Sequence, residues 1–219
     1  DIASVLRNLG SDVLSLGLSG YGPLKNYAVV KEYLKPNHKK VFYLHYEGND
    51  LTDLKEELKN NFLTKYLDKN FKQNLYDNNF YLEPTGLWKG FLKIFYSRKL
   101  ILGYLKFYGL TSVKKDFTEK NFNDFEKVLS DLNKYIKKNN SEFYFVYLPE
   151  RSRYYVDKDY IDQFDQVMNV AKKLNLPIID MKEVFSKEKN VMDLFAQYGG
   201  HYSPLGYKKV ATSIDNFLK

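Results

Sequence analysis

The sequence predicts an α/β fold, with a mostly parallel sheet and helices on both of its faces. Short apolar runs of strand length alternate with segments whose apolar residues recur at helical spacing along most of the 219 residues. Repetition of strand, loop and helix is typical of parallel strands joined by helical crossovers. The hydrophobic fraction of 44% and the charged fraction of 28% are those of a globular chain, so we expect one domain over residues 1–219.

The expected elements follow from apolar spacing and from capping residues. Four apolar runs predict buried strands at residues 13–18, 41–46, 143–148 and 177–181. Helical spacing predicts helices at residues 1–9, 24–34, 50–60, 118–138, 160–174 and 204–218. Asp1 can cap the first of these helices and Pro204 suits the first turn of the last one. Residues 184–195 are expected to be irregular or weakly helical.

Residues 62–115 interrupt this alternation. Aromatic residues and lysines dominate there, and scattered glycines and a proline punctuate the segment. We expect an insertion with one or two helices inside the domain. Two interpretations stay open: a lid or substrate wall, or a structural excursion that covers one edge of the sheet.

Composition limits the classes of function. The chain has no cysteine, which excludes disulfides and thiolate metal sites. No stretch has the roughly 18 unbroken apolar residues of a membrane span, so we expect no transmembrane segment. The formal charge of +7 comes from dispersed lysines, and no nucleic-acid-binding motif is recognised, so no nucleic-acid partner is expected. Oligomeric state and compartment stay open; a bacterial cell envelope and the cytoplasm are both compatible.

Three polar loops carry the candidate chemistry. Gly20 lies in the loop 19–23, Asn49 lies in the loop 47–50, and His201 precedes the last helix. Ligands of open parallel sheets bind at the carboxyl ends of the strands, so we expect these loops to meet there. The Gly20 N–H and the Asn49 amide can stabilise a negative oxygen, where losing one donor costs about 3–4 kcal/mol. The imidazole of His201 suits proton transfer near neutral pH.

These loops resemble the sequence blocks of the SGNH (GDSL-type) hydrolases. Residues 13–22 look like the second block, residues 46–50 like the third and residues 200–207 like the fifth. The resemblance covers nearly the whole chain. It implies a flavodoxin-like three-layer α/β/α sandwich, and ester hydrolysis or acyl transfer without a metal or cofactor.

The resemblance also assigns roles to residues. It implies that Gly20 and Asn49 form the oxyanion hole and that His201 is the catalytic histidine. The expected substrates are O-acylated carbohydrates or other small esters. Further residues of the same blocks are expected to contact the substrate: Tyr21, Glu47 and Tyr202.

Two features depart from the family pattern. The Gly-Asp-Ser block, which carries the nucleophile, is absent, so the chain as written lacks its serine and a central strand. We therefore expect the sheet either to re-pair across the gap or to accept a strand from elsewhere. The family also places an aspartate two or three residues before the histidine, where this chain has Tyr198 and Gly199. Asp193 is the nearest upstream carboxylate, and Asp180 and a serine–histidine dyad are alternatives.

Two hypotheses about function follow. The first is an esterase or O-acyltransferase whose nucleophile lies outside this chain, because Ser19 is better suited to a structural role and Ser203 to a helix cap. The second is a non-catalytic module that keeps the fold to bind a glycan or another partner. The missing serine and Tyr198 favour the second, so the sequence leaves open whether the chain is an enzyme.

Overall fold

The computed structural model describes residues 1–75, 117–155, 160–197 and 200–219. Its contacts divide the chain into two units, one made of Asp1–Gln73 with Phe117–Lys219 and the other of Asn74–Asp116. The helices expected in the insertion 62–115 lie mostly outside the described residues. Within its first part, the structure shows a short 3₁₀ helix, η1 (Leu63–Leu67), which belongs to the first unit.

Three parallel strands form the sheet of the first unit. They run in the order β1 (Lys40–Tyr46), β2 (Glu142–Leu148) and β3 (Ile178–Asp180). Phe145 pairs with Tyr43 on one side and with Ile178 on the other. The predicted α/β class, the parallel pairing and three of the four predicted strands are therefore confirmed.

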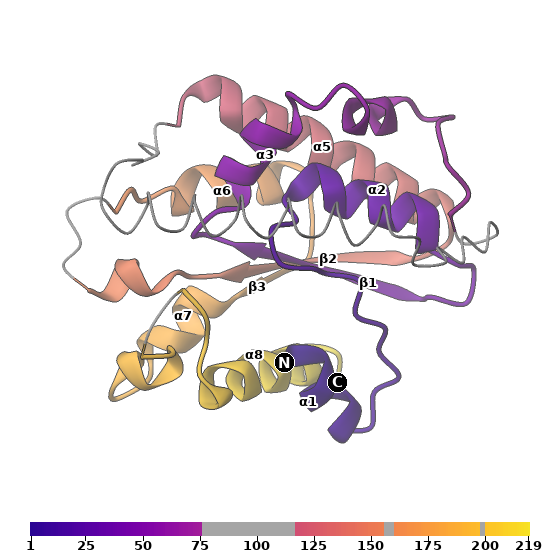
Figure 1. Ribbon diagram of the computed structural model, residues 1–219. Coiled ribbons are helices and arrows are strands. Elements are labelled where there is room, and N and C mark those ends of the chain that lie inside the picture. Colours follow the sequence, from indigo (N-terminus) through magenta and orange to yellow (C-terminus); the bar gives the residue numbers. More distant parts are fainter. Residues whose placement is uncertain (76–116, 156–159, 198–199) are drawn as a thin grey trace, which may run out of the picture. The chain divides into compact units, whose positions relative to one another are not determined.

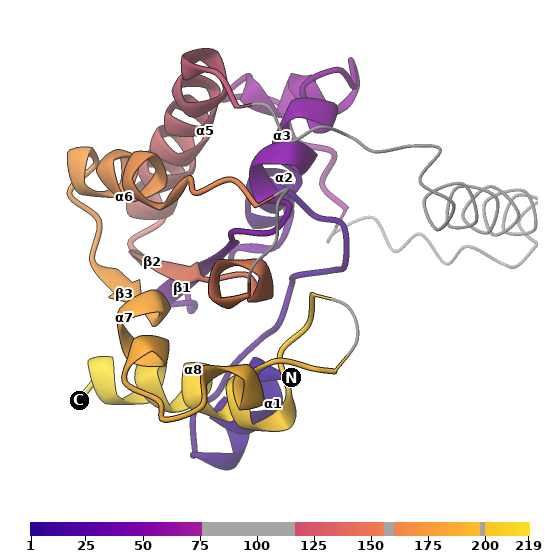
Figure 2. The same ribbon diagram turned by 90° about the vertical axis from the view of Figure 1, so that its left-hand side faces the viewer.

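Helices lie on both faces of this sheet (Figures 1 and 2). One face carries α2 (Pro23–Tyr33), α3 (Asp50–Glu57), α5 (Glu119–Lys138) and α6 (Phe164–Lys173). The other face carries α1 (Ile2–Asn8), α7 (Met181–Ser186) and α8 (Pro204–Phe217). Two further 3₁₀ helices are η2 (Arg151–Tyr154) and η3 (Val191–Leu194). Among the described residues, no helix combines the length and the apolar character that a membrane crossing requires.

The alternation of side chains along β2 explains why the sheet is covered twice. Phe145 and Tyr147 pack into one apolar cluster with α2, α3, α5 and α6, whereas Val146 and Leu148 pack into a second cluster with α1, α7 and α8. All four side chains are buried. A strand buried on both faces reads as a continuous apolar run, and the length of that run located β2 in the sequence.

Side-chain caps set the starts of three of the described helices, α1, α7 and α8. Asp1 accepts a 2.7 Å hydrogen bond from the Ser4 N–H, and Ser203 Oγ accepts one of 3.2 Å from the Gly206 N–H. Both helices thus begin where the sequence predicted. Asp180 caps α7 by accepting from the Lys182 N–H, which gives a regular helix over part of the chain that was expected to be irregular.

The prediction of a buried strand over residues 13–18 was wrong. None of these residues is in a strand, and Leu14 and Leu18 are 59% and 65% exposed. A strand is stabilised by hydrogen bonds to a neighbour, and no described strand pairs with this segment. Ser15 and Gly17 also interrupt its apolar character. Among the described residues, the sheet ends at β1, with neither a re-paired nor an added strand beyond it.

Candidate functional site

The carboxyl end of β1 brings two of the predicted loops together through one side chain. The hydroxyl of Tyr46 donates a 2.6 Å hydrogen bond to the carbonyl oxygen of Gly200, next to His201. The Tyr46 ring lies so close to Gly48 that a methyl group there would overlap its Cε1 atom. A methyl group on Gly200 would lie 2.7 Å from the Tyr46 hydroxyl oxygen. Tyr46 therefore connects the His201 turn to the loop that precedes Asn49.

Asp53 of α3 connects Asn49 to the third loop. The Asn49 side-chain nitrogen donates a 2.6 Å hydrogen bond to Asp53 Oδ2. Gly22 lies against the same residue, since a methyl group on it would lie 2.8 Å from Asp53 Cβ. The loop 19–23, the loop 47–50 and the turn before α8 thus form one continuous set of contacts. An amide nitrogen carries two hydrogens, so Asn49 keeps a second donor when Asp53 accepts the first.

Gly20 has a backbone conformation that few residues other than glycine adopt. Its φ of 78° lies in the left-handed region, which favours glycine. Lys25 Nζ donates a 2.8 Å hydrogen bond to the Gly20 carbonyl oxygen and so holds the peptide group that follows. Within the described part of the chain, the Gly20 N–H itself makes no hydrogen bond. This donor is therefore available to a ligand.

The buried carboxylate of Glu57 holds the other side of the same loop. It accepts hydrogen bonds from the N–H groups of Gly22, Leu24 and Lys25 at 2.7, 2.9 and 3.3 Å. The first N–H groups of a helix have no acceptor within the helix, and at the start of α2 the Glu57 carboxylate supplies one. Burial raises the pKa of the Glu57 carboxyl above its usual value, although the three backbone hydrogen bonds act in the opposite direction.

His201 lies on an exposed turn with a defined backbone. Its carbonyl accepts a 2.9 Å hydrogen bond from the Ala196 N–H, and an antiparallel bridge between Phe195 and Tyr202 closes the loop. Its imidazole makes no hydrogen bond or ion pair with any residue that the structure describes. A ligand can therefore reach the ring from solvent.

Neither candidate acid contacts His201 among the described residues. The Asp193 carboxylate accepts a hydrogen bond from the Asn190 side chain at 2.8 Å, and the backbone carbonyl oxygen of Asp193 accepts one from Ser203 Oγ at 2.6 Å. The Asp180 carboxylate caps α7, and burial raises its pKa above the usual value. The structure thus gives both aspartates other hydrogen bonds, and no described carboxylate orients the imidazole.

Of the predicted substrate contacts, Tyr202 is buried and Tyr21 is half-buried. The Tyr202 hydroxyl donates to the Pro149 carbonyl oxygen at 2.8 Å, and its ring packs edge-on against Tyr46. The ring thereby supports the His201 turn from inside. Lys25 Nζ lies 5.7 Å from the centre of the Tyr21 ring, beside Gly20.

Glu47 lies in the interior as the centre of a charged network. Its side chain is 0% exposed and binds Arg153 through both carboxylate oxygens, at 3.1 and 2.5 Å. It also accepts from the Glu150 N–H at 3.0 Å and from the Tyr160 hydroxyl at 2.9 Å. Glu47 therefore fixes both described ends of the segment that follows β2.

Arg153 extends this network to Asp162. Two hydrogen bonds, of 3.0 and 2.5 Å, join the guanidinium to the Asp162 carboxylate. Partial burial acts to raise the pKa of Asp162, but the bonds from Arg153 and from the Phe164 N–H bring it below its usual value. Burial acts to lower the pKa of Arg153, but the hydrogen bonds and charges of Glu47 and Asp162 have the larger effect and raise this pKa above its usual value. The guanidinium therefore stays charged.

A scan against protein-family models and searches of curated proteins and of solved structures each found no match to this chain. Its function is therefore argued from the contacts above. Among the described residues, no group of three or more histidine, aspartate or glutamate side chains is placed to hold a metal ion.

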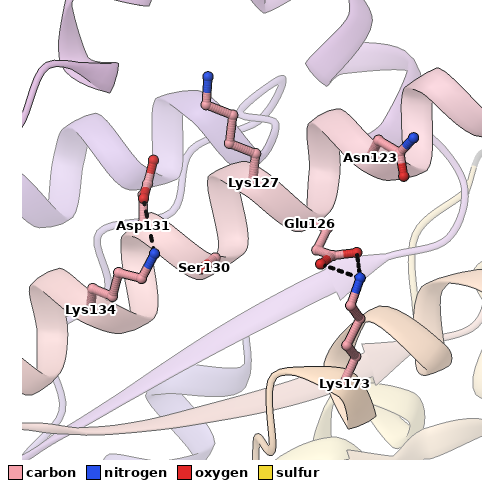
Figure 3. Close-up of a pocket in the computed structure, with 7 residues that line it drawn as sticks. All are labelled: Asn123, Glu126, Lys127, Ser130, Asp131, Lys134 and Lys173. Atoms are coloured by element: carbon pink, nitrogen blue, oxygen red, sulfur yellow. Dashed lines mark hydrogen bonds and ion pairs between the residues drawn. The ribbon is translucent and has the colours of Figure 1, made fainter.

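A surface hollow on α5 and α6 contains none of the predicted site residues (Figure 3). Lys173 pairs with Glu126 at 2.7 Å, and Lys134 approaches Asp131 at 3.8 Å. The side chains that line this hollow are polar or charged: Asn123, Glu126, Lys127, Ser130, Asp131, Lys134 and Lys173. Such a lining is typical of a solvated helix face rather than of a ligand pocket.

Sequence reasoning missed the residues that hold the loops in place. Tyr46 and Glu57 sit inside or next to the recognised motifs, but they bind Gly200 and Gly22, which are far away in the chain. Asp53 binds the nearby Asn49, and its contact with Gly22 is the distant one. Arg151 and Arg153 offered a signal, because two arginines directly follow an apolar strand and Pro149. Charged residues at that position lie where ligands of parallel sheets bind.

Proposed function

We propose that this chain is a domain of an SGNH-type ester hydrolase or O-acyltransferase that acts on O-acylated carbohydrates or other small esters. The observation that carries the proposal is the set of contacts through Tyr46 and Asp53, which link the loops of Gly20, Asn49 and His201. Helices on both faces of a parallel sheet also agree with the three-layer sandwich of that family.

The proposed chemistry assigns each group one role. A serine hydroxyl attacks the ester carbonyl carbon while His201 takes the hydroxyl proton. The negative oxygen then accepts hydrogen bonds from the Gly20 N–H and from the second amide hydrogen of Asn49. The ester C–O bond then breaks as His201 gives the proton to the leaving alcohol, and the acyl group stays on the serine. Water or an acceptor hydroxyl attacks this acyl-serine while His201 takes its proton, and the serine–acyl bond breaks as His201 returns that proton to the serine oxygen.

The attacking serine belongs to the Gly-Asp-Ser block, which these 219 residues do not contain. Two serines lie within the motif loops. Ser203 caps α8 and is therefore poorly suited to be the nucleophile. Its hydroxyl donates a hydrogen bond to the Asp193 carbonyl oxygen and accepts one from the Gly206 N–H. Ser19 is exposed next to Gly20.

The proposal is tested on the protein translated from the whole reading frame that encodes these residues. It should hydrolyse p-nitrophenyl acetate, and His201→Ala should abolish turnover. Asn49→Ala should lower kcat about 100-fold to 1000-fold, as the loss of one oxyanion donor does. His38→Ala is the matched control, because His38 lies before β1, at the other end of the strand, and should keep full activity. Absence of turnover on every acyl ester tried would refute the proposal.

A non-catalytic binding module is the second candidate. It is favoured by the His201 imidazole, which has no carboxylate partner among the described residues. A binding module would hold an O-acetylated oligosaccharide without cleaving it. Nuclear magnetic resonance of the mixture over hours separates the two candidates, because only the enzyme releases acetate.

A further inference from the structure

Two arginines of η2 have opposite surroundings, although one residue separates them. Arg153 is bound on both sides by the carboxylates of Glu47 and Asp162. Among the residues that the structure describes, Arg151 makes a single hydrogen bond, in which Nη1 donates to the Gln197 carbonyl oxygen at 2.9 Å. Within the described residues, no carboxylate pairs with Arg151. A guanidinium has five N–H donors, so most of its donors are unused.

The single bond of Arg151 places it against the loop that carries His201. Gln197 lies one residue after Ala196, whose N–H closes the loop on the His201 carbonyl. Tyr46 holds the other side of the same loop through Gly200. Arg151 thus lies shortly after the carboxyl end of β2 and beside the proposed catalytic turn, and the residue as a whole is half-buried.

We infer that Arg151 is a specificity residue, which binds a carboxylate carried by the ester substrate close to the acylated oxygen. This inference rests on the proposed function. The planar guanidinium matches a carboxylate with two parallel hydrogen bonds, and partial burial reduces the screening of that interaction by water. The dispersed lysines attract anions in general, whereas an arginine fixed by Gln197 can orient one.

The rival interpretation is that Arg151 only tethers the loop. A tether would affect all substrates alike, because it acts through the position of His201. A specificity residue affects only substrates that carry the anion. The two roles therefore separate in a comparison of a charged ester with a neutral ester of the same acyl group.

The experiment measures kcat/KM for 4-acetoxybenzoate and for its neutral methyl ester, on the protein of the whole reading frame. Arg151→Gln should lower the ratio of kcat/KM for the charged ester to kcat/KM for the neutral ester about tenfold, because KM for the charged ester increases. Arg151→Lys should give an intermediate ratio, because it keeps the charge but not the planar fork. Lys134→Gln removes the same charge from the outer face of α5 and should leave the ratio as in the wild type.

Each outcome decides a different point. If Arg151→Gln lowers both constants equally, Arg151 is a tether and the inference is wrong, while the esterase function stands. If neither ester is hydrolysed, the esterase function fails. Binding of 4-acetoxybenzoate to the 219-residue chain, followed by calorimetry, then decides about the anion site. Saturable binding that weakens about tenfold in Arg151→Gln supports it, and no binding refutes it.

Discussion

The hydroxyl of Tyr46 donates a 2.6 Å hydrogen bond to the carbonyl oxygen of Gly200, across a sequence separation of 154 residues. The last residue of β1 thereby positions the turn of His201. Its ring also meets the Tyr202 ring edge-on, with 6.5 Å between the ring centres. The sheet therefore helps to position the candidate base, through the side chain of Tyr46.

Tyr46→Phe tests this connection. The variant loses the hydrogen bond but keeps the ring, so its free energy of unfolding should fall by about 1 kcal/mol. The Gly200 and His201 amides should exchange hydrogen faster than in the wild type, since their loop loses one of its attachments. Tyr144→Phe is the control, because that hydroxyl binds the nearby Glu142 on the surface and no other residue that the structure describes. Unchanged exchange in Tyr46→Phe would show that other contacts hold the turn.

Gly48→Ala tests the close packing of the Tyr46 ring. The added methyl group overlaps Cε1 of the ring, so the free energy of unfolding should fall by about 1–3 kcal/mol. In a Tyr46→Ala background the same substitution should cost much less, and the difference is the coupling between the two residues. Gly17→Ala has no atom within 4 Å of the new methyl group and should change little. Equal costs of Gly48→Ala in both backgrounds would contradict this account.

Local sequence was sufficient for most of the fold. β1 and β2 are apolar on both faces and long enough to recognise, and α1 and α8 carry their own capping residues. The segment 13–18 shows where the approach stops. Its residues favour a strand, but a strand also needs hydrogen bonds from an adjacent strand. The sequence of the segment does not show whether such a strand is present.

The candidate site was predictable in its loops and not in its supporting contacts. Asn49 and His201 belong to short motifs, so Asn49 was predicted to follow a strand and His201 to precede the last helix. The ion-pair partner of Glu47, Arg153, lies 106 residues away in the chain. The sequence around Glu47 does not indicate that partner. Because of this distance, a residue expected to face a substrate lies instead in a buried ion pair.

Glu47→Gln tests the contribution of that ion pair. Glu47 is fully buried and the Arg153 side chain is 8% exposed, so neutralising Glu47 leaves the buried guanidinium, among the described residues, with the more exposed Asp162 as its remaining carboxylate partner. We expect the free energy of unfolding to fall by about 3–5 kcal/mol, measured by urea denaturation. Asp162→Asn is the control, because the Asp162 side chain is 56% exposed and its exposed pair should contribute below about 1 kcal/mol. Similar losses in the two variants would argue against a special role for Glu47.

The carboxyl of Glu57 predicts a pH dependence of stability whose sign is fixed by its environment. Burial raises its pKa above the usual 4.5, so the folded state binds its proton more tightly than the unfolded state does. The contribution of Glu57 to stability is therefore fully present below the unfolded pKa and is lost as the pH rises through the folded pKa.

Glu57→Gln should remove this dependence. In urea titrations between about pH 4 and pH 8, the free energy of unfolding of the wild type minus that of the variant should decrease as the pH rises, and then stay constant. Asp162→Asn should show the reverse trend at lower pH, because the pKa of Asp162 is lowered and its contribution is lost as the pH falls. A difference for Glu57→Gln that increases with pH would mean that the hydrogen bonds from Gly22, Leu24 and Lys25 outweigh burial at this carboxylate.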